Sequence, residues 1–89
     1  MIIIISRDNA IDEITKYYET FDDKSNAQLA LRNRMVKFIN ETKTTQREIS
    51  RRTGIPESVI SEWKWQKHIT HLYLIDAGKL LLYLTSKGY

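Results

Sequence analysis

The sequence predicts an all-α fold, a bundle of four to five short helices preceded by a short extension that holds a strand and a helix. Apolar residues recur at spacings of three and four along most of the chain, and capping residues and glycines stand where helices would begin and end. The 89 residues have room for one domain. The absence of cysteine excludes disulfides and thiolate metal sites within this sequence.

Residues 1–24 are expected to form the N-terminal extension. The β-branched run Ile2–Ile5 predicts a short strand. This strand either packs on its own domain or pairs with its copy in a second subunit, and we favour pairing because a lone strand cannot satisfy its own backbone. The apolar positions of Ile11–Phe21 lie at helical spacing, which predicts a helix capped by Asp8 or Asn9.

The next helix is predicted from Ser25 to about Glu41. Ser25 and Gln28 have the spacing of a capping box, in which each side chain bonds the free amide of the other residue. Arg32, Arg34 and Lys37 would lie on faces away from the core. The apolar stripe expected to face the core consists of Leu31, Met35, Phe38 and Ile39.

A helix-turn-helix is predicted over residues 45–65. Thr45 and Glu48 form a second capping box, and Gly54 supplies the left-handed backbone that ends the first helix of the motif. Pro56 suits the first turn of the second helix, predicted over 56–64, because the amide that proline lacks is not needed there. The residues expected to lock the two helices onto a third are Ile49, Ile55, Val59, Ile60 and Trp63, with the small Ser50 beside them.

A last helix is predicted over Leu72–Leu84. Its inner face would consist of Leu72, Ile75, Leu81 and Leu84. Gly78 would weaken or kink this helix. The main domain would therefore span residues 25–85, with 86–89 as a flexible end.

The two parts of the chain differ in charge. Residues 1–24 hold three basic and six acidic side chains, a net charge of −3, whereas residues 25–89 hold 11 basic and five acidic ones, a net charge of +6. This asymmetry favours a polyanionic partner for the body of the chain. Ile2–Ile5 lacks the basic region that precedes the apolar part of a signal peptide and is too short to span a bilayer, so we expect a cytoplasmic protein without a membrane partner.

The stretch TTQREISRRTGIPESVISEW resembles the helix-turn-helix of the lambda-repressor-like, Cro/XRE-type DNA-binding domains. The matching residues are Gln46, Ile49, Gly54, Ile55, Val59, Ile60, Ser61 and Trp63. The resemblance extends more loosely over residues 25–84 and implies a lambda-repressor-like bundle. It also implies a sequence-specific transcriptional regulator, by default a repressor, of phage, prophage or bacterial type. Ser50 stands where this family usually has alanine, and residues 64–66 lack the acidic residue and glycine that often close the recognition helix.

The resemblance implies double-stranded DNA as the partner. In such domains the outer face of the recognition helix enters the major groove and contacts base edges. The residues on that face are Glu57, Ser58, Ser61 and Glu62. Phosphate contacts set register without carrying base information, and the candidates for them are Gln46, Arg47, Arg51, Lys64 and Lys67. A homodimer on two half-sites is the arrangement that such domains usually adopt.

A rival hypothesis is a protein-interaction module, such as an antirepressor-like or antitoxin-like phage accessory protein. It would bind another protein through the acidic segment Asp8–Asp23 or through the strand. DNA binding that weakens steeply with salt would favour the regulator, whereas little DNA affinity at any salt would favour the interaction module.

Enzymatic and metal functions have no support in the sequence. No grouping resembles a nucleophile with its base or a glycine-rich phosphate loop, so we expect no enzyme and no cofactor. His68 and His71 are three residues apart, but no cysteine or carboxylate lies near them in sequence, so we expect no metal site. Trp63 is expected in the core, whereas Trp65 would be half-exposed and pack on Leu72–Leu84 or on a partner.

Overall fold

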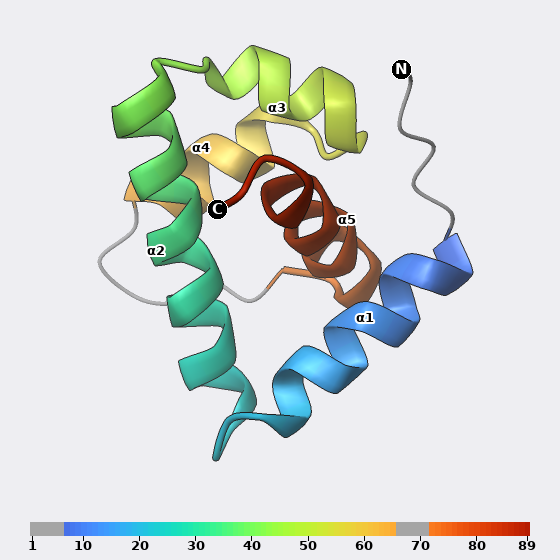
Figure 1. The fold of residues 1–89 in the computed structure, drawn as a ribbon. Coiled ribbons are helices and arrows are strands. Elements are labelled where there is room, and N and C mark those ends of the chain that lie inside the picture. The colour runs from blue at the N-terminus through green and yellow to red at the C-terminus, as the bar shows by residue number, and fades with distance from the viewer. Residues whose placement is uncertain (1–6, 66–71) are drawn as a thin grey trace.

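The structure is a computed structural model that describes residues 7–65 and 72–89. These residues form five helices, namely α1 (Arg7–Glu19), α2 (Lys24–Thr42), α3 (Gln46–Thr53), α4 (Glu57–Trp65) and α5 (Leu74–Ser86). α5 lies at the centre, with α1, α2 and the pair α3 and α4 around it (Figure 1). The all-α prediction is confirmed for the described residues as a small helical bundle. The expected strand Ile2–Ile5 lies outside them.

α1 and α5 cross at very close range. Ala10 and Ile14 of α1 are fully buried against the rest of the bundle. A Cβ atom added to Gly78 of α5 would lie 2.2 Å from the carbonyl oxygen of Ala10. Gly78 therefore permits two helix backbones to touch, and α5 continues through it as one helix. The sequence predicted that Gly78 would weaken or kink the helix. In the structure Gly78 is instead the place where α5 packs against α1.

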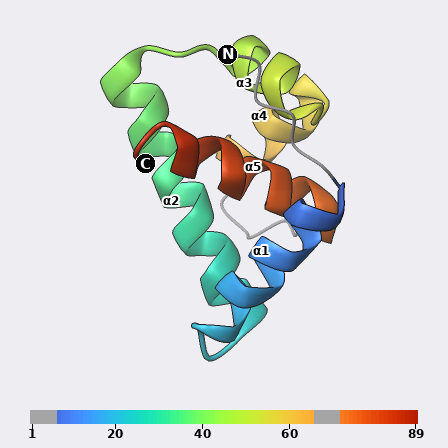
Figure 2. The ribbon, with the colours of Figure 1, turned by 45° about the vertical axis from the view of Figure 1, so that its right-hand side comes forward.

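α1 shares one hydrophobic core with the other helices. Ile14 belongs to the same buried cluster as Leu31, Met35 and Leu84, and the rings of Tyr17 and Tyr18 pack against that cluster. The segment that we assigned to an extension thus contributes to the main core. α5 lies between α1 and the pair α3 and α4 (Figure 2).

The predicted caps of the first two helices are wrong. α1 already includes residues 7–9, so Asp8 and Asn9 lie inside its first turn instead of preceding it. α2 is capped by Asp23, whose carboxylate accepts a hydrogen bond of 2.8 Å from the amide of Asn26. Because this cap lies two residues before Ser25, the predicted capping box of Ser25 and Gln28 does not form. The Gln28 side chain is buried instead.

The apolar stripes of α2 and α5 follow the predicted periodicity. Leu31, Met35 and Phe38 of α2 are buried, whereas Ile39 is half-buried. Near and within α5, the predicted inner-face residues Leu72, Leu81 and Leu84 are buried. Ile75 is only half-buried, and α5 begins and ends two residues later than predicted.

The last residues, which we expected to form a flexible end, make defined contacts. The Tyr89 ring packs edge-on against Phe38, with 5.2 Å between ring centroids. The Tyr89 amide donates to the carbonyl oxygen of Leu84 over 2.9 Å. Arg34 Nε of α2 donates to the Tyr89 carbonyl oxygen over 2.6 Å. Tyr89 thereby joins the C-terminal end of α5 to α2.

Candidate nucleic-acid interface

α3 and α4 are joined by the three residues Gly54–Pro56, where the sequence predicted the turn. The Thr45 hydroxyl accepts from the amide of Glu48 over 3.1 Å, which confirms the predicted start of α3. Gly54 has a φ of 80° and its amide donates to the carbonyl oxygen of Ser50 over 2.8 Å, which confirms the predicted end. α4 begins one residue later than predicted, because Pro56 precedes it and its carbonyl oxygen accepts from the amides of Val59 and Ile60.

Two hydroxyl groups that the sequence analysis did not assign hold this turn. Thr53 Oγ1 donates to the carbonyl oxygen of Ile49 over 2.7 Å and accepts from the amide of Ile55 over 3.2 Å. Ser50 Oγ donates to the carbonyl oxygen of Ile55 over 2.5 Å. The Ser50 side chain therefore bonds the turn that follows its own helix.

The inner faces of α3 and α4 form part of the core, as predicted. Ile49 and Ile55 are fully buried, and Ile60 and Trp63 are 2% exposed, so the prediction that Trp63 is a core residue is confirmed. Val59 is half-buried. The side chain of Trp65 lies outside the described part of the chain.

α2 holds the C-terminal end of α4. Arg32 Nη2 donates to the carbonyl oxygen of Lys64 over 2.8 Å, at the end of a helix where carbonyl groups lack partners within the helix. A cation is also favourable at that end because of the helix dipole. Together with the buried face, this bond fixes the direction in which α4 leaves the core.

The outer face of α4 is polar. Glu57, Ser58 and Glu62 are exposed and Ser61 is half-buried. At helical spacing these four residues lie on the side of α4 opposite Ile60 and Trp63. The residues proposed from the sequence to contact bases therefore share one accessible surface, which we call the outer face of α4.

The candidate phosphate contacts do not form one cluster. Gln46 is half-buried in the first turn of α3, and Arg47 and Arg51 are exposed on α3. Lys64 is half-buried near the C-terminal end of α4, and Lys67 lies outside the described residues. The structure thus brings Gln46 and Arg47 to the N-terminal end of α3 and leaves Lys64 at the other end of the motif.

Ion pairs occupy most of the charges on α3. Arg52 Nε lies 2.9 Å and Arg51 Nη1 lies 3.9 Å from the carboxylate of Glu48. The hydrogen bond from Arg52 lowers the pKa of the Glu48 carboxyl below its ordinary value. Arg47 Nε lies 3.8 Å from Glu57 Oε2, which joins the first turn of α3 to the first turn of α4.

The balance of charge on α3 and α4 is close to neutral. Residues 46–65 contain four basic and three acidic side chains, a net charge of +1. The electrostatic attraction of α3 and α4 for a polyanion is therefore modest. Binding of a polyanion by these two helices would depend more on where individual charged groups lie than on the net charge.

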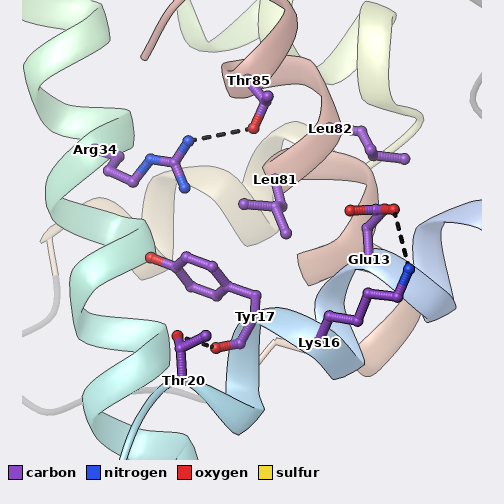
Figure 3. Close-up of a pocket in the computed structure, with 8 residues that line it drawn as sticks. All are labelled: Glu13, Lys16, Tyr17, Thr20, Arg34, Leu81, Leu82 and Thr85. Carbon is purple, nitrogen blue, oxygen red and sulfur yellow. Dashed lines mark hydrogen bonds and ion pairs between the residues drawn. The ribbon is translucent and has the colours of Figure 1, made fainter.

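A separate hollow lies between α1, α2 and α5 (Figure 3). Its lining residues are Glu13, Lys16, Tyr17, Thr20, Arg34, Leu81, Leu82 and Thr85. Arg34 Nη2 donates to Thr85 Oγ1 over 3.3 Å, and its guanidinium lies 5.6 Å from the centre of the Tyr17 ring. Lys16 and Glu13 form an ion pair of 3.9 Å at the edge of the hollow. Arg34 thereby joins α2 to α5 and to α1, whereas the pair of Glu13 and Lys16 lies within α1.

Within residues 7–65 and 72–89, no group of three histidine, cysteine, aspartate or glutamate side chains could hold a metal ion. His68 and His71 lie outside these ranges. None of the helices in the same ranges is long and apolar enough to cross a membrane.

Comparison of the chain with protein-family models, with curated proteins and with solved structures found no match. The residues of the motif and the geometry of α3 and α4 are therefore the observations from which we infer a function.

Proposed function

We propose that this protein is a sequence-specific DNA-binding regulator of transcription, most simply a repressor, that inserts α4 into the major groove. The observation that carries this proposal is the division of α4 into a buried face, with Ile60 and Trp63, and a polar outer face. A helix held on one face by its own core can present the other face to base edges without rearrangement. The resemblance of residues 44–63 to Cro/XRE-type domains supports the same proposal and suggests a lambda-repressor-like arrangement.

In this proposal the outer face of α4 supplies the contacts that distinguish sequences. The hydroxyls of Ser58 and Ser61 can donate to or accept from several bases, and a glutamate can accept from the amino group of cytosine. Gln46 lies at the N-terminal end of α3, where free amides and the helix dipole favour a phosphate. Contacts there would set the register of α4 without contributing base information.

A second candidate function is protein interaction, and the charge of the outer face favours it. Two exposed carboxylates, those of Glu57 and Glu62, lie where DNA would approach, and a polyanion repels them. Asp8 and Asp12 are exposed on α1, which α5 separates from α3 and α4 (Figure 2). A protein partner could therefore bind α1 while the surface of α4 stays accessible.

Selection from a random pool of DNA duplexes tests the proposal. A regulator should enrich one sequence motif, and a homodimer should enrich two half-sites whose centres are about 34 Å apart. The logarithm of its binding constant should fall linearly with the logarithm of salt concentration, by about 0.9 for each phosphate contacted. A protein-interaction module should enrich no motif and should show little DNA affinity at any salt concentration.

A further inference from the structure

Arg47 and Glu57 join the two helices of the motif at their N-terminal ends. Arg47 is the second residue of α3 and Glu57 is the first residue of α4. Their side chains, 79% and 49% exposed, form the ion pair of 3.8 Å between Nε and Oε2. Thr45 and Gln46 line the same shallow hollow as this pair. A candidate phosphate contact and a candidate base contact are therefore partners in the free protein.

The pair changes what Glu57 can do near DNA. A lone carboxylate at the front of α4 would be repelled by the phosphates on both sides of the groove. A guanidinium at ion-pair distance offsets part of that charge, and a carboxylate paired through one oxygen keeps acceptor capacity on both oxygens. With Oε2 beside Arg47, Oε1 of Glu57 can still accept a hydrogen bond from a base edge.

The other cations of α3 have a different partner. Arg51 and Arg52 both pair with Glu48 of their own helix. Among the described residues, the ion pair between α3 and α4 is the one formed by Arg47 and Glu57. Arg47 is therefore the α3 cation placed to orient a group on the outer face of α4.

We infer, on the basis of the proposed function, that Arg47 is a positioning residue for base recognition. It holds the Glu57 carboxylate toward the amino group of a cytosine in the major groove, and its own guanidinium pairs with Glu57 in place of a phosphate. The site contacted by the first turn of α4 then contains a C·G pair. Glutamate is the acceptor that suits the cytosine amino group, whereas a glutamine at the same place suits adenine.

A double-mutant cycle over positions 47 and 57 tests this inference. The selected duplex and its single-base variants are titrated with the wild type, Arg47→Ala, Glu57→Gln and the double variant. Arg47→Ala should lower the preference for cytosine at one base pair by at least about three-fold, and this loss should vanish in the Glu57→Gln background. Glu57→Gln should shift the preference at that same base pair from cytosine toward adenine.

The dependence of binding on salt distinguishes positioning from phosphate contact. Removal of a phosphate contact lowers the salt slope by about one, whereas removal of a positioning residue leaves the slope unchanged. Arg47→Ala should therefore keep the wild-type slope. Arg51→Ala is the matched control, since it removes an exposed arginine of α3 that pairs with Glu48, and it should show no coupling to Glu57→Gln. Because the Arg47 and Glu57 side chains are exposed, we expect their variants to fold, and circular dichroism checks this.

The possible results separate this inference from the proposed function. Equal loss of affinity for all duplexes in Arg47→Ala, with a shallower salt slope, makes Arg47 a phosphate contact; the inference fails and the proposed function stands. A loss of cytosine preference that persists in the Glu57→Gln background also overturns the inference alone. A wild-type protein that enriches no motif overturns the proposed function, and the inference falls with it.

Discussion

Gln28 of α2 and Leu72, two residues before α5, are joined by two hydrogen bonds through one side-chain amide. Gln28 Nε2 donates to the Leu72 carbonyl oxygen over 3.1 Å, and the Leu72 amide donates to Gln28 Oε1 over 2.9 Å. Nε2 also donates to the hydroxyl of Tyr18 over 2.8 Å. Gln28 is fully buried, so this side chain satisfies backbone groups at the point where the chain enters the central helix.

Replacement of Gln28 by leucine should lower the free energy of unfolding by about 2 kcal/mol or more. Leucine fills a similar volume but leaves the buried amide and carbonyl of Leu72 without their partner, and each unpaired group carries a desolvation penalty. Urea unfolding followed by circular dichroism gives this difference. Asn33 is an exposed residue on the same helix, and Asn33→Ala should change the free energy of unfolding by no more than about 0.5 kcal/mol. Equal stability of Gln28→Leu and Asn33→Ala would contradict the assigned role of Gln28.

The contrast between Gln28 and Thr45 shows what the sequence could predict. Both residues fit a capping pattern, but the bond of Thr45 to Glu48 spans three residues, and a local pattern is enough to identify it. The partner of Gln28 lies 44 residues away, so no local pattern shows it. The role of Gly78 was missed for the same reason, because its neighbour is the backbone of Ala10 in another helix.

In the candidate site, too, the features that depend on neighbouring residues were predictable and those that depend on distant residues were not. The faces of α4 follow from helical spacing, which is local, and the structure has Ile60 and Trp63 inside and Ser58 outside. The ion pair of Arg47 with Glu57 depends on how the turn places two helix ends, and no spacing rule in the sequence gives that distance.

Replacement of Gly78 by alanine should destabilise the protein, although the same change stabilises most helices. In an exposed helix interior, alanine is better than glycine by about 1 kcal/mol. Here the added Cβ would lie 2.2 Å from the carbonyl oxygen of Ala10, so α1 and α5 must separate. We expect the free energy of unfolding of Gly78→Ala, measured by urea unfolding, to be lower than that of the wild type by about 2 kcal/mol or more.

The partner variant Ala10→Gly tests the cause of that loss. It removes the Ala10 side chain but keeps the backbone oxygen that the new Cβ meets, so it should not rescue Gly78→Ala. A rescue would show that the contact is between side chains.

Replacement of Gly54 by valine should lower the stability by more than about 1 kcal/mol. The φ of 80° at Gly54 is a conformation that a β-branched residue resists. The nearest atom to an added Cβ is Lys79 Nζ at 3.7 Å, an ordinary contact, so the loss comes from the backbone. Gly54→Asn should lower the stability less than Gly54→Val does, since asparagine tolerates the left-handed backbone conformation. Thermal melts that rank asparagine below valine would place the strain in the side chain instead.

The pair of Glu48 and Arg52 should make stability depend on acidic pH. The hydrogen bond from Arg52 lowers the pKa of Glu48 in the folded state, so its stabilisation is present above the pKa of the unfolded state, about 4.3. It is lost as the pH falls through the folded pKa. Arg52→Gln should therefore melt below the wild type at about pH 6, and the two melting temperatures should converge toward about pH 3. Arg51→Gln, which removes the longer contact of 3.9 Å, should show a smaller convergence. A constant gap across this range would exclude Glu48 as the source.

Replacement of Ser58 and Ser61 together by alanine should leave the fold nearly intact and relax sequence discrimination. These residues are three apart on the outer face of α4, whereas Ile60 and Trp63 hold the inner face in the core. Each good base contact contributes about 1–3 kcal/mol of discrimination, so the affinity for the selected duplex should fall at least several-fold while the affinity for scrambled DNA changes little. Gln46→Ala should instead weaken binding to all duplexes, because a phosphate contact carries no base information. Fluorescence anisotropy at fixed salt concentration measures both variants on both duplexes. If the double serine variant keeps the wild-type affinity and preference, then α4 does not contact the bases, and the protein-interaction function is favoured.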